Sequence, residues 1–289
     1  EALKLGLELA TKTGADLMLA TDPDADRVGI AMKCPDGSYE LVSGNEMGVL
    51  LLDYVCSHRK ARKGELPPVA VKTIVTTEMA VPICKKYGVE LRRTLTGFKF
   101  IGEQIKFFEQ NNSYNFVMGM EESYGCLVGT YARDKDAPVA VMCLCEAAAY
   151  CKSQGITLWD HMLDLYEKYG YYKEGLYTIT LKGVTGAEKI RKIMSSLRAE
   201  SLTQIDTLKV LKVRDYEKNT ITDLATGEVT ESGLPQSNVL YYDLEDGAWA
   251  CVRPSGTEPL VRVMIEGKDI KVIEQRAKEI ADLIEEKCK

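Results

Sequence analysis

Aspartates at every second position separate two apolar segments near the start of the chain, in the run Asp22-Pro23-Asp24-Ala25-Asp26-Arg27. The flanking segments, 17–20 and 28–32, read as strands, so the acidic residues lie in the loop between them. Clustered carboxylates repel one another and destabilise the folded state unless a hard cation neutralises them. The pattern therefore predicts a strand–loop–strand unit that binds a divalent metal, with a solvated acidic turn as the alternative.

The spacing of these carboxylates also fits the first half of an EF-hand loop. However, the sixth position is Arg27 rather than glycine, the twelfth is Lys33 rather than glutamate, and the flanks are strands. Three carboxylates on an extended loop can instead reach one Mg²⁺ and leave coordination positions open for a phosphate oxygen. Arg27 can hold another phosphate oxygen with its planar guanidinium.

The composition narrows the classes of partner. The 289 residues are 45% hydrophobic and 28% charged, which is typical of a globular protein with two or more domains. A net charge of −6 argues against nucleic acid as the main ligand, because polyanion binding normally needs a basic surface. No signal peptide or transmembrane run is visible, so no membrane partner is expected.

The cysteines and histidines of the chain indicate its redox environment and exclude some kinds of site. The 9 cysteines include no CxxC pair and indicate reduced thiols, which predicts a cytoplasmic location. The only histidines, His58 and His161, have polar or amphipathic surroundings. A histidine-based metal site or catalytic triad is therefore not expected.

Hydrophobic patterning predicts an α/β fold. From residue 45 to residue 153, helical and β-rich segments alternate, which indicates a mostly parallel sheet with helices on both faces. After Gly170 the predicted strands cluster, at 176–182, 207–213, 238–243, 248–253 and 260–266. We therefore expect mixed or parallel α/β sheet domains followed by a C-terminal α+β domain.

Two further loops carry groups that bind sugars and phosphates. The segment Gly119-Met120-Glu121-Glu122-Ser123-Tyr124-Gly125 follows a short predicted strand and could hold neighbouring sugar hydroxyls; an acidic surface turn is equally possible. The segment Arg253-Pro254-Ser255-Gly256-Thr257-Glu258-Pro259 joins two predicted strands. Its charge, hydroxyls and glycine favour a phosphate-binding loop over a tight polar turn.

Two lysines lie just before or at the start of predicted helices. Lys99 follows Thr96-Gly97-Phe98, and Lys135 precedes a helix that starts near Pro138, whose N-terminus favours anions. Taken singly, each would more often be an ordinary surface lysine.

Together and in this order, TDPDADR, GMEESYG and RPSGTEP resemble the motifs of the α-D-phosphohexomutase family, and most closely its bacterial phosphoglucomutase branch. The resemblance covers essentially the whole chain. It implies that Asp22, Asp24 and Asp26 bind Mg²⁺, and that Arg27 and Lys135 act at the reacting phosphate. It further implies that substrate is bound by Lys99, Glu121, Ser123, Arg253, Ser255, Gly256 and Thr257.

Such enzymes interconvert glucose 1-phosphate and glucose 6-phosphate through an enzyme phosphoserine and a bisphosphate intermediate. The family's Thr-Ala-Ser-His-Asn-Pro type loop, which carries that serine, does not occur in this sequence. The chain also opens within a predicted helix and has no initiator methionine. We therefore expect a fragment of a mutase, inactive alone, whose partners are hexose phosphates and the missing N-terminal domain of the same polypeptide.

The resemblance implies four segments. Residues 1–43 would be the end of domain 2 with the metal loop, and residues 44–155 domain 3 with the sugar-binding loop. Residues 156–172 would be a linker, and residues 173–289 domain 4 with the phosphate-binding loop. The alternatives are a phosphomannomutase or dual-specificity mutase, and a non-catalytic sugar-phosphate or metal-binding module.

Overall fold

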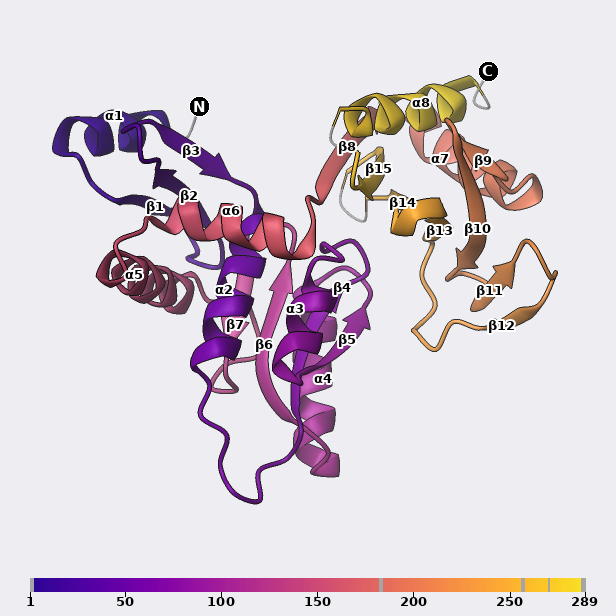
Figure 1. Cartoon of the computed structure of the whole chain (residues 1–289). Helices are drawn as coiled ribbons and strands as arrows, with labels where there is room; N and C mark the ends of the chain where they lie inside the picture. The colour runs from indigo at the N-terminus through magenta and orange to yellow at the C-terminus, as the bar shows by residue number, and fades with distance from the viewer. Residues whose placement is uncertain (1–2, 182–183, 256–257, 270, 287–289) are drawn as a thin grey trace. The chain divides into compact units, whose positions relative to one another are not determined.

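The computed structural model describes residues 3–181, 184–255, 258–269 and 271–286. The chain divides into two compact units, and the boundary in the sequence lies between Gly170 and Tyr171. The first unit alternates helices with two sheets, and the second combines one large antiparallel sheet with helices (Figure 1). The predicted fold class, α/β domains followed by an α+β domain, is confirmed.

The helices and strands of the first unit follow the predicted order closely. They are α1 (Lys4–Thr13), β1 (Leu17–Thr21), β2 (Val28–Lys33), β3 (Tyr39–Val42), α2 (Gly44–His58), β4 (Pro68–Thr73), α3 (Ala80–Tyr87), β5 (Glu90–Thr94), α4 (Phe98–Asn111), β6 (Asn115–Glu121), β7 (Gly125–Val128), α5 (Ala137–Ser153) and α6 (Leu158–Tyr169).

The smaller sheet of this unit, β1-β2-β3, is antiparallel and carries the aspartate loop at one end. Thr21 pairs with Val28, so the loop of residues 22–27 closes directly on the last pair of the β1–β2 ladder. Helix α1 packs on this sheet, where Leu3 and Leu7 contact a small core that includes Met18.

The larger sheet has the order β5-β4-β6-β7, in which β4 is parallel to both β5 and β6. Strand β7 was not predicted; it turns back from β6 and runs antiparallel to it. Val69 and Val71 of β4 pack in one core with α4. Because side chains alternate along a strand, Lys72 faces the opposite side of the sheet.

The buried Lys72 takes part in an ion-pair network at the carboxyl end of β4. Its Nζ lies 2.9 Å from Glu78 Oε1, and Glu78 Oε2 lies 2.6 Å from Arg93 on β5. Burial alone would raise the pKa of Glu78, but the Lys72 ammonium and the Arg93 guanidinium outweigh it and lower that pKa to about 2. The network thus joins β4, β5 and the segment that leads into α3.

Acid should weaken this network, because its stabilising effect depends on the charged Glu78 carboxylate. Since the pKa of Glu78 is lowered from 4.5 to about 2 by folding, this stabilisation is fully present above about pH 4.5 and is lost as the pH falls toward 2. We expect Glu78→Gln to lower the unfolding free energy of the first unit by about 3 kcal/mol at pH 7. The difference from the unsubstituted chain should shrink at pH 3. Native-state hydrogen exchange of the β4 amides measures it.

The matched control is Glu90→Gln, which removes the carboxylate of an exposed ion pair between Glu90 and Arg92, both on β5. This change should alter stability by less than about 1 kcal/mol at either pH. A cost for Glu78→Gln that does not vary between pH 7 and pH 3 would contradict the stabilising role of the charged network.

The second unit is built on one antiparallel sheet of the order β12-β11-β10-β13-β14-β15-β8, with β9 paired to the start of β10. Its elements are β8 (Lys173–Thr180), α7 (Val184–Ala199), β9 (Gln204–Ile205), β10 (Leu208–Asp215), β11 (Thr220–Asp223), β12 (Val229–Glu231), β13 (Leu240–Leu244), a 3₁₀ turn (Glu245–Gly247), β14 (Trp249–Pro254), β15 (Leu260–Gly267) and α8 (Ile273–Glu286). Helices α7 and α8 share a buried core with the sheet, in which Ile193 and Ile280 lie with Val252.

Most of the predicted linker, residues 156–172, is helical in the structure. It contains α6, which packs within the first unit against α5 and β2. A linker in this stretch is therefore confined to the few residues around Gly170. The other predicted domain boundaries stay predictions.

The described cysteines are free thiols, and all of them except Cys145 are buried. Among the described helices, none combines the length and apolar content needed to cross a bilayer.

Candidate functional site

The aspartate loop is held in shape by its own first carboxylate. Asp22 Oδ1 accepts the backbone N–H groups of Asp26 at 3.1 Å and Arg27 at 3.0 Å. The Arg27 N–H bond is the main cause of a lowered pKa for Asp22, so its carboxyl group favours the charged form. Ala25 adopts a φ of 54°, which lets the chain turn within the loop.

Carboxylate oxygens of Asp22, Asp24 and Asp26 all lie within 4.8 Å of one another. Asp24 is exposed and the other two are half-buried, so the group faces outward from the loop. Arg27 Nε lies 3.6 Å from Asp26 Oδ1 and 4.0 Å from Asp22 Oδ2. The donor set and its spacing fit a hard divalent cation such as Mg²⁺.

Lys135 joins this cluster from a distant part of the chain. Its Nζ lies 2.7 Å from Asp26 Oδ2, and its side chain is only 12% exposed. Burial disfavours the charged ammonium, but the neighbouring carboxylates, Asp26 first, outweigh it and raise the pKa of Lys135. Lys135 is therefore a protonated group directly beside the acidic loop.

Backbone hydrogen bonds and one glycine fix the position of Lys135. The Ala137 N–H donates to the Ala25 carbonyl at 3.0 Å, which joins the start of α5 to the aspartate loop. A Cβ atom at Gly125 would lie 2.1 Å from Lys135 Cδ, so the lysine side chain passes directly over this glycine. Any larger residue at position 125 would displace Lys135.

The segment predicted to bind sugar is a strand–turn–strand rather than an open loop after a strand. Residues 119–121 finish β6, residues 122–124 form the turn, and Gly125 begins β7. Tyr124 has a φ of 67°, and its carbonyl accepts the Val28 N–H at 3.2 Å. The turn is thereby tied to β2, immediately beyond the aspartate loop, and Ser123 is half-buried within it.

Glu121 closes the cluster. Its Oε1 accepts the Gly97 N–H at 2.9 Å, and the residue is buried. Burial, followed by the charge of Glu122, raises its pKa, whereas the charges of Lys135 and Arg27 act in the opposite direction. Glu121 therefore shares one electrostatic environment with Lys135 and the aspartate loop.

Lys99 is placed differently from the other predicted residues of this unit. It is exposed, and its Nζ lies 4.9 Å from the centre of the Phe100 ring. Its neighbour Gly97 contacts Glu121 instead. The sequence analysis gave no role to Gly97, although it lies in the Thr96-Gly97-Phe98-Lys99 segment that was singled out.

The predicted phosphate-binding loop joins β14 to β15 in the second unit. Arg253 Nε is buried and has no hydrogen-bond partner among the described residues. Ser255 Oγ accepts the Glu258 N–H at 3.3 Å, and the Ser255 N–H donates to the Leu260 carbonyl at 2.9 Å. Gly256 and Thr257 lie outside the described residues.

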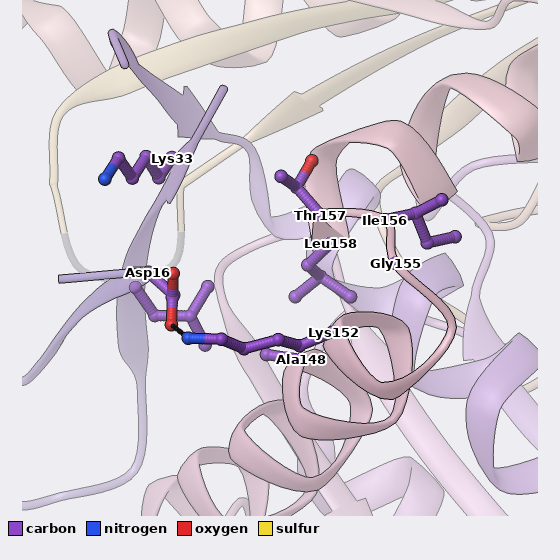
Figure 2. A pocket seen from close by; sticks show the side chains of 9 residues that line it. Asp16, Lys33, Ala148, Lys152, Gly155, Ile156, Thr157 and Leu158 are labelled. Atoms are coloured by element: carbon purple, nitrogen blue, oxygen red, sulfur yellow. Dashed lines mark hydrogen bonds and ion pairs between the residues drawn. The ribbon is translucent and has the colours of Figure 1, made fainter. Parts of the chain in front are cut away.

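A cavity of about 300 Å³ lies elsewhere in the first unit, between the start of β1, the end of β2 and the α5–α6 turn (Figure 2). Lys152 and Asp16 form an ion pair of 2.7 Å at this cavity, and Leu17 and Leu158 also line it. None of the predicted site residues is among the described residues that line it. The candidate site is therefore the cluster of predicted residues around the aspartate loop.

Two sequence profiles of one family match the chain. The profile for the phosphoglucomutase/phosphomannomutase alpha/beta/alpha domain III matches residues 43–169, and the profile for the C-terminal domain of the same family matches residues 197–283. The first match contains the GMEESYG segment and the second contains the RPSGTEP segment, in the expected order. The chain belongs to the phosphohexomutase family.

Individual relatives agree. A phosphoglucomutase of Staphylococcus saprophyticus is 35% identical over 277 residues, which are 95% of this chain and 50% of that protein. A solved phosphoglucomutase/phosphomannomutase family protein of Burkholderia thailandensis covers 99% of this chain and 50% of its own, with a TM-score of 0.63 at 15% identity. The Paramecium parafusin (phosphoglucomutase) covers 94% and 44%, with a TM-score of 0.61 at 20% identity.

The two solved structures, at such low identity, establish the fold alone. The chain spans about half the length of the curated relatives that it matches.

Proposed function

We infer that this chain supplies the metal-binding, sugar-binding and phosphate-binding segments of a mutase that interconverts glucose 1-phosphate and glucose 6-phosphate. The observation that carries this proposal is the gathering of the aspartate loop, Lys135 and Glu121 from three separate segments of the first unit. A solvated acidic turn would not require a buried lysine held against it.

Asp22, Asp24 and Asp26 would hold Mg²⁺, which, when bound, would polarise a phosphoryl group and neutralise part of its charge. Their oxygens lie close enough together to serve one ion, and hard cations prefer such ligands. Asp22 has the additional task of fixing the loop through its two backbone hydrogen bonds.

Arg27 and Lys135 would act on the phosphoryl group itself. Arg27 is half-exposed beside the carboxylates, so its guanidinium can turn toward a phosphate oxygen. Lys135 is held protonated by Asp26 and could donate a proton or a hydrogen bond to an oxygen of the reacting phosphate. Their positive charges would stabilise negative charge that develops in the transition state.

Sugar hydroxyls would be held by Glu121 and Ser123, with Lys99 reaching the sugar from the start of α4. The non-reacting phosphate would bind to Arg253, Ser255, Gly256 and Thr257. The buried Nε of Arg253, which has no partner among the described residues, supports this assignment, because a buried donor is stabilised when it gains an acceptor. Since the substrate must bind in both orientations, these contacts would have to serve either end of the sugar.

Turnover would need a phosphoserine that this sequence does not contain, and the chain corresponds to about half of its relatives. We therefore expect the 289-residue chain, assayed with glucose 1-phosphate and Mg²⁺, to give no measurable isomerisation. Rapid formation of glucose 6-phosphate by the purified chain would overturn this expectation. Reading the coding sequence upstream for a phosphoserine loop is the accompanying test, since a non-catalytic binding module would lack one.

Glucose phosphates are proposed over mannose phosphates because an aromatic residue and glycine follow Glu121-Glu122-Ser123. The family profile covers both kinds of mutase. Turnover of glucose and mannose 1-phosphates by the full-length enzyme would distinguish them. The cytoplasmic location and the absence of nucleic-acid partners stay predictions.

A further inference from the structure

The Glu122 carboxylate, which the sequence analysis left without a role, points back into the protein beneath the sugar-binding turn. Its Oε2 accepts a hydrogen bond from Thr73 Oγ1 at 3.1 Å, and Thr76 Oγ1 lies 3.5 Å away. Both threonines are fully buried. Glu122 is thus an internal anchor for the turn that presents Glu121 and Ser123.

The two threonine hydroxyls form a small closed array. They lie 2.8 Å from each other, and Thr76 Oγ1 also accepts the Thr73 N–H at 3.2 Å. Thr73 Oγ1 accepts the Val75 N–H at 3.3 Å. Each hydroxyl carries a single proton, so when Thr73 donates to Glu122, the Thr76 hydroxyl is the donor in the pair between the two threonines.

Lys72 binds the backbone of the segment that carries the two threonines. Its Nζ, which is fully buried, donates to the Thr76 carbonyl at 2.5 Å and to Glu78 at 2.9 Å. A buried ammonium is tolerated only where its partners are in place, so Lys72 fixes the backbone of residues 73–76. Arg93 extends the connection to β5 through Glu78.

The segment that follows β5 also contacts Glu121, the predicted sugar-binding residue beside the turn. Glu121, the neighbour of Glu122, is fixed on one oxygen by the Gly97 N–H, and Gly97 follows β5. Glu121 ends β6 and pairs with Gly125 of β7, so a displacement of the adjoining turn reaches it through this strand end. The anchoring of Glu122 therefore acts directly on Ser123 in the turn and, through the strand end, on Glu121.

We propose that Thr73 and Lys72 are positioning residues for the sugar-binding turn, acting through the Glu122 carboxylate. The identity of the ligand in this proposal rests on the proposed function; the positioning of the turn does not. Neither residue needs to contact the substrate.

The first test uses backbone-amide NMR spectra of the ligand-free chain. Thr73→Val keeps the shape of the side chain but removes the hydroxyl, and should shift the amides of Gly97 and of residues 121–125. Thr73→Ser, which keeps the hydroxyl, should restore them. The matched control is Thr94→Val, because Thr94 is also buried, and its hydroxyl donates to the Leu95 carbonyl at 3.1 Å and reaches the Lys72 carbonyl at 3.5 Å rather than Glu122.

The second test is calorimetric binding in the presence of Mg²⁺. Thr73→Val should weaken binding of glucose 1-phosphate by about tenfold and leave binding of inorganic phosphate unchanged, since only the sugar contacts are displaced. Lys72→Met should act in the same direction. Equal losses for both ligands, or equal losses in Thr94→Val, would indicate general destabilisation and overturn the proposal.

The two tests separate the two hypotheses. If the unsubstituted chain binds no glucose 1-phosphate, the proposed function fails, while the amide shifts still decide the positioning role. If Thr73→Val leaves the amides of residues 121–125 in place, the positioning role fails, whatever the chain binds.

Discussion

Replacing Gly44 by alanine should lower the unfolding free energy of the first unit by about 3 kcal/mol, near the upper end of the usual cost of overpacking. A Cβ atom at this position would lie 2.1 Å from the Glu122 carbonyl oxygen and 2.6 Å from the Tyr124 nitrogen. Both atoms belong to backbone, so the collision cannot be relieved by a side-chain rotation. Hydrogen exchange of the β6 amides would measure the loss.

Gly48, one turn further along α2, is a matched control. A Cβ atom there would meet the sulfur of Met120 at 2.9 Å, and this flexible side chain can move aside. Alanine also favours a helix over glycine by up to about 1 kcal/mol. Gly48→Ala should therefore change stability by less than about 1 kcal/mol, and equal effects at the two positions would show that the backbone collision is not decisive.

The Gly44 substitution should also affect the candidate site. The turn of residues 122–124 would have to move away from α2, and it carries both the Glu122 anchor and the carbonyl that binds the Val28 N–H. A shift of the turn would reach Glu121 on one side and the aspartate loop on the other. The amide signals of both segments should therefore move together in Gly44→Ala but not in Gly48→Ala.

Local chemistry is the part of this site that the sequence predicts. The alternation of Asp22, Asp24 and Asp26 between two apolar runs is visible without a structure, and it led to a hairpin loop with three neighbouring carboxylates. The two flanking segments predicted as strands, 17–20 and 28–32, are observed as β1 and β2. Hydrophobic periodicity and turn residues depend on a few neighbouring positions, so these local features can be predicted from the sequence.

Contacts between segments far apart in the chain could not be predicted from the sequence. Strand β7 was missed because four residues between a turn and a loop show too little alternation to be recognised. The roles of Gly44 and Gly125 depend on what packs against them, and sequence alone does not show which backbone or side chain that is. Lys135 could be paired with Asp26 only through a family resemblance, because their proximity arises from the packing of α5 against the aspartate loop.

Asp24→Asn should weaken divalent-cation binding by about tenfold or more, which corresponds to about 1.4 kcal/mol per factor of ten. Asp24 is the most exposed of the three carboxylates, whereas Asp22 also fixes the loop backbone. Its replacement therefore removes one charge from the cation site with the least disturbance of the loop. Line broadening of the amides of residues 22–28 by Mn²⁺ would measure the affinity even where binding is weak.

Lys135→Met should have the opposite effect on the same measurement. In the structure the Lys135 ammonium lies on Asp26 Oδ2 and competes for an oxygen that the cation would use. Removing that charge leaves three carboxylates without their nearest buried cation, so the loop should bind Mn²⁺ and Mg²⁺ more tightly. Weaker binding in Lys135→Met, or unchanged binding in Asp24→Asn, would contradict a cation site formed by these aspartates. Opposite changes in the two variants would separate direct coordination from a general effect on the fold, because a misfolded loop would lose affinity in both.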